Sequence, residues 1–357
     1  MTSTSARIAA DLAGEITPPD EQWRARARTH LDQLTKPLGS LGRLEELAAQ
    51  IVSIRRETVT APLRKAVYVF AADHGITVEG VSAYPSAVTH QMVLNFLAGG
   101  AAINVLARLH GVDLRVVDMG VDADLDRTSG LLHHKIARGT ANMLRQAAMT
   151  DEQLAQALRV GAQLASEAAA DGVTVLAIGE MGIGNTTSAS AITCALTGSA
   201  ASVATGRGTG LDAEAHVRKV AVVDAILKKH FTAAPTPIDI LRCAGGLEIA
   251  GITGMVMGAA RHRLVVVADG FISTAAAALA VALAPNVRGY LIAGHRSEEP
   301  GHGILLDYLE LKPILSLEMR LGEGSGAVLA MPVIESAIAL YGQMATFASA
   351  GVSEASA

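Results

Sequence analysis

The chain contains few cysteines and few aromatic residues. Only 2 of its 357 residues are cysteine, Cys194 and Cys243, and both stand in alanine-rich apolar surroundings. Two isolated thiols form neither a disulfide framework nor a zinc site, so we interpret both as core residues. Aromatic residues make up 3% of the chain, whereas small residues are abundant. This composition favours helices packed closely on a sheet over a sandwich or barrel built from large side chains.

The chain also lacks a strong charge imbalance and a long uninterrupted apolar run. Its formal net charge is -5 and it has no basic block, which argues against nucleic-acid binding. The longest apolar runs are strand-sized or broken by Gly and Pro, so no membrane span stands out. The first residues include Arg7, Asp11 and Glu15 and show no apolar signal-peptide core. We therefore expect a soluble, cytoplasmic protein that binds no membrane.

The two ends of the chain have helical patterns. Helices are predicted over residues 22–34 and 41–57, on either side of the Pro/Gly-rich turn TKPLGSLG, and over the alanine-rich residues 332–348. The length allows two domains, or one large α/β unit with an accessory part. We expect residues 1–62 and 331–357 to form a small helical domain, and residues 63–330 to form a large α/β catalytic domain.

Between the ends, short apolar runs alternate with helical patterns. The apolar runs are residues 66–71, 114–119, 173–178, 264–268 and 287–293. The predicted helices are residues 91–110, 151–170, 185–196 and 214–230, the second opened by a capping box of Thr150 and Gln153. This alternation predicts an α/β fold: a Rossmann-like parallel sheet with helices on both faces.

Glycine and polar residues gather directly after the apolar runs, where such a sheet places its ligand crevice. Four turns there resemble phosphate-binding helix starts: GIGNTT (182–187), GRGTG (206–210), DGFIST (269–274) and GHRSEEPGHG (294–303). None is a Walker A loop or a dinucleotide fingerprint. One such turn alone is more often structural, but four on one expected edge favour a ligand site. Lys219 follows GRGTG, and its spacing fits a solvated helix face and a buried edge near an anion equally well.

Two glutamates stand inside glycine-rich turns. Glu180 lies in GEMGIGN, and Glu323 lies in RLGEGSGA between Gly322 and Gly324. Flanking glycines leave a carboxylate unshielded, and a partly apolar cleft raises its pKa toward that of a general base. Taken alone, the Glu323 pattern is better explained by an acid on a surface turn.

Several other classes of site are disfavoured. His74 and His90 lack the spacing of metal ligands, so we expect no metal site. Ser325 has no nucleophile-elbow context and no paired histidine after it, which argues against a serine hydrolase. The loop that carries Tyr84 and Pro85 would suit a flat apolar ring.

Nine motifs in a fixed order carry a resemblance to a known family. They are TKPLGSLGRLEELA, ADHGI, GVSAYP with VTHQMV, GEMGIGNTTSASAI, GRGTGLD, GGLEIAGITG, DGFISTAAAAL, GHRSEEPGH and MRLGEGSGA. From about Leu31 to Met331 the chain resembles the nicotinate-nucleotide–dimethylbenzimidazole phosphoribosyltransferase family. Each motif alone is moderately specific, and the ordered set is highly specific.

The resemblance implies an activity and an assembly. The family transfers the 5-phosphoribosyl group of nicotinate mononucleotide to 5,6-dimethylbenzimidazole, which yields α-ribazole 5'-phosphate and nicotinate for the lower ligand of cobalamin. The family implies a homodimer that uses small-molecule substrates and no metal or cofactor. Its donor is not phosphoribosyl pyrophosphate, and no acidic pyrophosphate-binding motif occurs in this chain.

The resemblance also assigns roles to residues of this sequence. Glu323 matches the general base, and Glu180 matches a second acid that we expect to stabilise positive charge on the ribose. The remaining residues are the phosphate ligands Lys219, Gly208, Gly270 and Ser297, the nicotinate and ribose contacts Gly182 and Thr186, and the base-pocket residues Ser82, Tyr84, Ser86 and Gln91.

Two alternatives stand beside the transferase. One is a non-catalytic nucleotide- or riboside-binding protein on the same fold, although the presence of Glu180, Lys219 and Glu323 argues against it. The other is a nucleoside phosphorylase or hydrolase, in which phosphate or water replaces the base.

Overall fold

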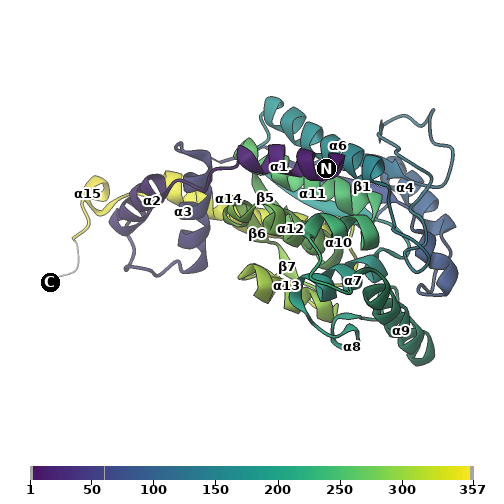
Figure 1. The fold of residues 1–357 in the computed structure, drawn as a ribbon. Coiled ribbons are helices and arrows are strands. Elements are labelled where there is room, and N and C mark those ends of the chain that lie inside the picture. Colours follow the sequence, from purple (N-terminus) through teal and green to yellow (C-terminus); the bar gives the residue numbers. More distant parts are fainter. Residues whose placement is uncertain (1–2, 60, 354–357) are drawn as a thin grey trace.

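Figure 1 shows the computed structural model of the chain, which describes residues 3–59 and 61–353. Six strands form one parallel sheet: β1 (Lys65–Ala72), β2 (Asp113–Gly120), β3 (Leu131–His133), β4 (Val175–Met181), β5 (Val265–Ala268) and β6 (Leu291–Ala293). Their order is β3-β2-β1-β4-β5-β6. This is the doubly wound order, and its direction of growth reverses between β1 and β4. The predicted α/β fold class is confirmed.

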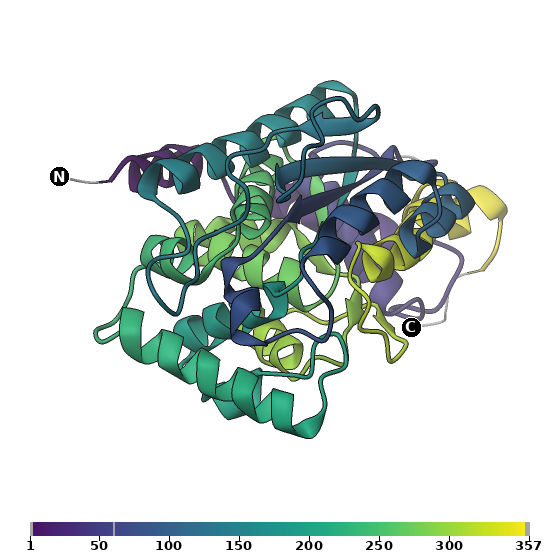
Figure 2. The ribbon, with the colours of Figure 1, turned by 90° about the vertical axis from the view of Figure 1, so that its right-hand side faces the viewer.

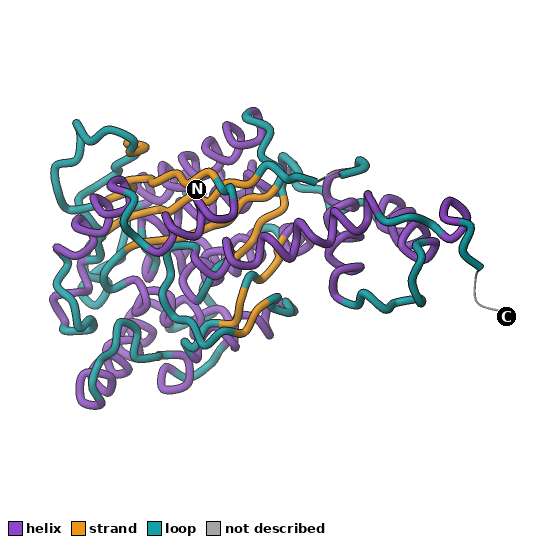
Figure 3. The backbone as a smooth tube through the Cα atoms, turned by 180° about the vertical axis from the view of Figure 1, so that it is seen from behind, coloured by secondary structure: helices purple, strands orange, loops and turns teal. Residues whose placement is uncertain are grey.

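Helices cover both faces of the sheet. On one face lie α11 (Leu247–Arg261) and α12 (Phe271–Leu283), with α6 (Asp151–Ala170) outside α11. On the other face lie α4 (Ala87–Ala98), α5 (Ala102–His110) and α14 (Ser325–Gln343). Figure 3 shows the strands enclosed between these helical layers. Because both faces are covered, β1 is buried from Ala66 to Ala72, which explains its continuous apolar sequence.

The other elements complete the two ends and the wall beside the sheet. They are α1 (Thr4–Gly14), α2 (Glu21–Gln33), α3 (Arg43–Arg55), η1 (Gly75–Glu79), α7 (Asn185–Thr197), α8 (Ala201–Ala204), α9 (Ala213–His230), α10 (Pro237–Ala244), η2 (Pro285–Tyr290), β7 (His295–Arg296), α13 (Pro300–Leu309), β8 (Leu315–Ser316) and α15 (Phe347–Ala350). In Figure 2, α9 runs along the lower edge of the molecule, below the end of the sheet. The capping box of Thr150 and Gln153 is confirmed, with the Thr150 amide donating to Gln153 Oε1 at 2.9 Å.

Three sequence predictions differ from the structure. Residues 91–110 are not one helix, because Gly99 adopts a left-handed φ of 80° and ends α4 before α5 begins. The C-terminal helix starts at Ser325 and contains Pro332, whereas the sequence pattern predicts Pro332 as its first residue. The last apolar run begins as η2, so only Leu291–Ala293 pairs as a strand. The three-residue strand β3 was not predicted, since it is too short to show a pattern.

The two ends of the chain lie side by side. Figure 1 shows α2, α3 and α15 gathered at the end of α14, away from the sheet. The Thr35 amide donates to the Ala345 carbonyl at 2.9 Å, and Leu34 forms a bridge with Thr346. The first helix lies elsewhere: α1 packs on α6, and the Thr4 amide donates to Asp151 Oδ2 at 2.7 Å. The division into domains 1–62 with 331–357 and 63–330 stays a prediction.

Two helical stretches are long and apolar enough to cross a membrane by length and composition alone. They are Ala87–His110, with 33% of its apolar 18-residue segment buried, and Ser325–Gln343, with 56% of the corresponding segment buried. The first is interrupted at Gly99 between α4 and α5. Both stretches pack against the sheet, and Val105 and Leu109 of the first remain exposed.

The contact between α6 and α11 predicts a stability effect. A Cβ atom on Gly161 would lie 1.9 Å from the Gly251 carbonyl oxygen, whereas one on Gly303 in α13 would meet nothing within 4 Å. We expect Gly161→Ala to lower the free energy of unfolding by about 1–3 kcal/mol or more, because backbone atoms must move apart. The matched Gly303→Ala should be neutral or stabilising by up to about 1 kcal/mol, since alanine favours the helix. Thermal melting compares the two, and equal midpoints would contradict the packing argument.

Candidate active site

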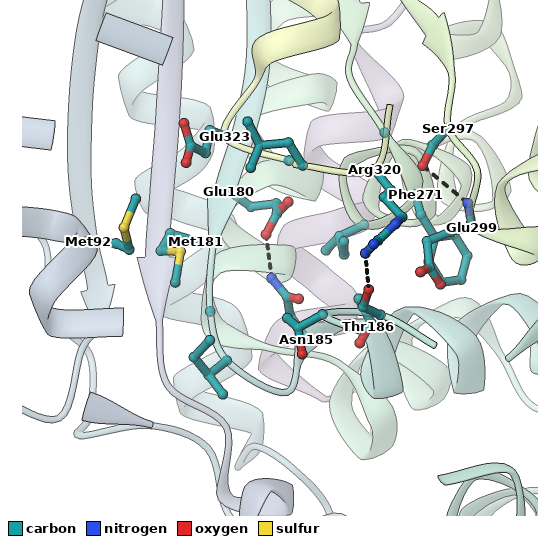
Figure 4. Close-up of a pocket in the computed structure, with 18 of the residues that line it drawn as sticks. Met92, Glu180, Met181, Asn185, Thr186, Phe271, Ser297, Glu299, Arg320 and Glu323 are labelled. Carbon is teal, nitrogen blue, oxygen red and sulfur yellow. Dashed lines mark hydrogen bonds between the residues drawn. The ribbon is translucent and has the colours of Figure 1, made fainter. Parts of the chain in front are cut away.

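A cavity of about 400 Å³ lies beyond the C-terminal ends of β4 and β5. Its wall includes Glu180 and Met181 at the end of β4, Gly270 after β5, and the turn before α14. This is the edge where a doubly wound sheet leaves its crevice. Figure 4 shows two carboxylates, Glu180 and Glu323, on one side of the cavity, and Arg320, Ser297 and Glu299 toward the other.

Glu180 is the penultimate residue of β4 and is 7% exposed. Its Oε2 accepts a hydrogen bond from the side-chain amide of Asn185, the first residue of α7. The turn between them is possible because Gly184 adopts a φ of 97°, a region that disfavours residues with a Cβ. A Cβ atom on Gly322 would lie 2.5 Å from Glu180 Oε1, so the turn that carries Glu323 touches Glu180 directly.

Glu323 lies between Gly322 and Gly324, and all three residues have positive φ angles of 89°, 66° and 85° in chain order. Its side chain is turned into the protein, which leaves the residue 6% exposed. Oε2 accepts a hydrogen bond from the Ile103 amide at 3.2 Å, in the first turn of α5. The positive end of that helix favours a carboxylate. Glu323 is therefore an acid held in the cavity wall, and the alternative of a surface-turn acid is wrong.

The lining of the cavity includes three of the residues predicted to hold phosphate. Gly208, Gly270 and Ser297 line it, as does Thr186. Lys219 of α9 is fully buried behind this wall, and its Nζ donates to Thr186 Oγ1 at 2.8 Å. A Cβ atom on Gly208 would lie 3.0 Å from that Nζ, so the Gly208 backbone lies close to the buried ammonium group.

The predicted base-pocket residues are only partly brought to the cavity. Tyr84 lines it, together with Val88 and Met92 of α4. Ser82 reaches the cavity rim through Thr209, with 3.5 Å between the two hydroxyl oxygens. Ser86 and Gln91 do not line the cavity and are exposed in this chain. Consecutive helical residues project about 100° apart, so Met92 faces the cavity where Gln91 does not.

Several lining residues were not predicted from the sequence. They are Val88, Met92, Met181, Ile183, Asn185, Thr209, Phe271, Ile272, His295, Glu299, Arg320, Leu321 and Gly322. The clearest omission is Arg320, whose Nη1 donates to the Gly208 carbonyl at 3.0 Å. Arg320 lies three residues before Glu323, in the same motif RLGEGSGA. A cation beside a glycine-rich turn is a sequence signal for an anion-binding residue.

Burial sets the charges of the cavity. Burial, then the charges of Asp269 and Glu248, raise the pKa of Glu180 to about 8. Burial also raises the pKa of Glu323, against the hydrogen bond from the Ile103 amide that lowers it. Burial lowers the pKa of Lys219 to about 8, while Glu299 raises it. Near neutral pH the buried Glu180 is therefore mostly protonated, whereas an exposed glutamate would be ionised.

The described residues contain no group of three or more His, Cys, Asp or Glu side chains that could hold a metal ion. His74 is instead paired with a carboxylate, at 2.6 Å between Nε2 and Glu248 Oε1, and both side chains are buried. The pair lies behind Gly182, whose Cβ position is 3.4 Å from the His74 ring. It supports the glycine turn that follows β4.

The sheet order and the cavity define a doubly wound α/β protein with a crevice for a small polar ligand, bordered by two buried acids and several glycine turns. A family model described as "Phosphoribosyltransferase" matches residues 16–352. The chain belongs to this phosphoribosyltransferase family.

Individual relatives are similar to this chain over nearly their whole lengths. The chain is 51% identical to nicotinate-nucleotide–dimethylbenzimidazole phosphoribosyltransferase of Geobacter sulfurreducens over 344 residues, which is 96% of this chain and 98% of that protein. It is 52% identical to the protein of the same name from Chloroflexus aggregans over 339 residues, 95% of this chain and 96% of that one. The crystal structure of CobT from Thermus thermophilus superposes with a TM-score of 0.89 at 46% identity, covering 94% of this chain and all of that one.

The raised pKa of Glu180 predicts a pH dependence of stability. Between the ordinary value of 4.5 and about 8, the folded protein keeps a proton on Glu180 that the unfolded chain has lost. The free energy of unfolding therefore falls as pH rises through this window. Glu180→Gln carries no such proton, so its melting temperature should rise relative to that of wild type as pH increases from about 5 to about 8. The corresponding change in the difference between their free energies of unfolding is about a few kcal/mol.

The control is Glu152→Gln, which alters an exposed glutamate of α6. Its melting temperature should keep a constant offset from wild type. An offset for Glu180→Gln that is equally flat would show that Glu180 does not keep its proton in the folded state.

Proposed function

We propose that this protein transfers the 5-phosphoribosyl group of nicotinate mononucleotide to 5,6-dimethylbenzimidazole, for the lower ligand of cobalamin. The products are α-ribazole 5'-phosphate and nicotinate. The observation that carries the proposal is one cavity with Glu323 and Glu180 on one side and Ser297 and Arg320 toward the other, with Gly208 and Gly270 also in its lining. Membership of the phosphoribosyltransferase family and the names of the relatives support it.

Glu323 serves as the general base. Its carboxylate takes the proton from one ring nitrogen of the benzimidazole, while the electron pair of the other ring nitrogen forms the bond to C1'. The bond from C1' to the pyridinium nitrogen breaks, and its electron pair leaves with nicotinate as a neutral ring nitrogen. Attack from the face opposite nicotinate inverts the β-nucleotide to an α-riboside. The raised pKa of Glu323 brings its basicity nearer to neutral pH, which suits this proton transfer.

Glu180 stabilises the positive charge that develops on the ribose. Its pKa of about 8 leaves most of it neutral at pH 7 before the donor binds. The donor brings a pyridinium cation into the cavity, and a cation at close range favours the ionised carboxylate. Glu180 therefore ionises as the donor binds, with Asn185 holding its orientation. Gly182 and Thr186 contact the nicotinate and ribose end of the donor.

The phosphate binds at the other end. Gly208 and Gly270 offer their backbones, Ser297 its hydroxyl, and Lys219 an ammonium group that the phosphate dianion keeps protonated. The near-complete burial of Lys219 strengthens this attraction, because little water screens it. Arg320 borders the same region and adds a second positive charge.

The acceptor base lies against the apolar wall of Tyr84, Val88 and Met92. A flat aromatic ring suits this surface, since Tyr84 can stack on it, Met92 adapts its shape to it and Val88 adds apolar contact. Ser82, Ser86 and Gln91 remain proposed base contacts.

The protein is also proposed to be a cytoplasmic homodimer that binds neither nucleic acid nor membrane. Val105 and Leu109 support the homodimer, because these exposed apolar side chains lie one turn apart on α5. A face of this kind is typical of a surface covered by a partner.

Replacing the proposed base tests the reaction. With nicotinate mononucleotide and 5,6-dimethylbenzimidazole, wild-type protein should release nicotinate and form the α-ribotide, detected by chromatography with mass analysis. Glu323→Gln keeps the size of the side chain and removes the base, so product formation should fall about 100- to 10,000-fold. Binding of the donor, measured by calorimetry, should persist.

The same assay separates the alternatives. A binding protein would take up the donor without releasing nicotinate, and a phosphorylase or hydrolase would give ribose phosphates without an α-ribotide. Unchanged turnover in Glu323→Gln would show that Glu323 is not the base.

Replacing the buried lysine tests phosphate binding. Lys219→Gln should lower kcat/KM for the donor by about 10- to 100-fold, because a charged hydrogen bond is lost. In wild type the donor KM should rise as pH increases above about 8, where the lysine loses its proton. Lys219→Gln should lack that rise. Lys229→Gln, an exposed lysine of the same helix, is the control and should behave as wild type. A wild-type pH response in Lys219→Gln would exclude the lysine as its source.

A further inference from the structure

The turn that carries Glu323 has an unusual backbone. Residues 322–324 all lie in the left-handed region, and Glu323 is not a glycine. Such a conformation persists only where its surroundings impose it. The orientation of the Glu323 carboxylate depends on this backbone conformation, so the contacts that stabilise the turn also affect catalysis.

A buried aspartate makes two of these contacts. Asp269 is the first residue after β5 and is 2% exposed. Its Oδ2 accepts from the Gly324 amide at 3.2 Å, and its Oδ1 accepts from the Ala327 amide at 2.9 Å. Gly324 is the N-cap of α14 and has no side chain to cap the helix. Asp269 supplies this cap from another part of the chain, where the positive end of the helix favours its charge.

The sheet supports the turn from the other side. A Cβ atom on Gly179 of β4 would lie 2.6 Å from the Glu323 carbonyl carbon and oxygen, so the two backbones touch. Asp269 itself is flanked by His295, with 3.6 Å between Nε2 and Oδ1. The turn is thus fixed between the ends of β4 and β5, which are neighbouring strands.

We propose that Asp269 is a positioning residue for the base, because it clamps the Gly324 amide of the turn and the Ala327 amide in the first turn of α14, and so directs the Glu323 carboxylate into the cavity. Asp269 does not line the cavity, so it acts through the turn and not on the reacting atoms. The inference rests on the proposed function of Glu323. Besides the two acids in the cavity wall, the inference assigns a role to a third acid, Asp269, which lies behind the wall in another segment of the chain.

Asp269→Asn tests the proposal with little change in volume. Asparagine offers one acceptor and places an NH₂ group against the second amide, so the turn loosens. We expect kcat for α-ribotide formation to fall about 100-fold, as for a misplacement of about 1 Å, with the donor KM changed by less than about threefold. A kcat within about threefold of wild type would overturn the proposal.

Asp118→Asn is the matched control. Asp118 is also a buried aspartate at the end of a parallel strand, with Oδ1 accepting from the Val121 amide at 2.9 Å, but it lies outside the cavity. Its replacement should alter the melting temperature without a comparable loss of kcat. An equal loss of kcat in both variants would show a general structural effect and overturn the proposal.

A double-mutant cycle with Glu323→Gln asks whether Asp269 acts through Glu323. If it does, Asp269→Asn should reduce kcat little further once the base is absent. Losses that multiply would assign Asp269 an independent role and contradict the inference.

Hydrogen exchange tests the clamp without any assay of activity. Amides of the peptide that contains Gly324 and Ala327 should exchange faster in Asp269→Asn than in wild type. Unchanged exchange would overturn the clamp itself. A wild-type protein that forms no α-ribotide would refute the proposed function instead, and the exchange measurement would still report on the turn.

Discussion

The close approach of the turn 322–324 to the end of β4 is the contact on which the site depends. Gly179 lets the Glu323 backbone touch the strand, and Gly322 lets the turn reach the Glu180 carboxylate, since a Cβ on either would lie within 2.6 Å of its neighbour. Two acids far apart in sequence thereby share one cavity. The left-handed backbone, the cap from Asp269 and the start of α14 all follow from this approach. Without either glycine, the turn would have to move and Glu323 would leave its place against α5.

Burial then decides what these groups do. Burial raises the pKa of Glu180 to about 8, so this acid is mostly protonated near neutral pH. Burial lowers the pKa of Lys219 to about 8, so this lysine keeps its charge near neutral pH and loses it above about pH 8. The site therefore suits a ligand that carries charges opposite to those of the ionised Glu180 and Lys219. A donor with a cationic ring at one end and a phosphate dianion at the other favours the ionised form of Glu180 and stabilises the ammonium form of Lys219. The electrostatics thus favour the whole donor over the free phosphate or the free ring, because each end compensates a different buried group.

Much of this arrangement follows from local patterns. Buried runs such as residues 66–71 and 264–268 predicted a parallel sheet, and the glycine turns after them marked the correct edge. Other features do not follow from local patterns. Gln91 and Met92 are adjacent in sequence, and only the orientation of α4 shows that Met92 faces the cavity. Arg320 reaches Gly208, which is more than a hundred residues away in sequence. The break at Gly99 depends on a single left-handed glycine inside an otherwise helical pattern.

The amino-acid sequence by itself determined the fold class, the family and the chemical character of the site. Strand and helix periodicities and the glycine turns are local, and they follow from local steric and hydrophobic preferences. The family follows from the resemblance that the ordered motifs carry. Only the tertiary structure decided which side chains meet. Segments distant along the chain meet at three places. They bury Glu180 and so raise its pKa, they bring Asp269 to the turn that carries Glu323, and they place Lys219 next to Thr186. Such contacts depend on how the layers pack, and no spacing within one segment contains that information.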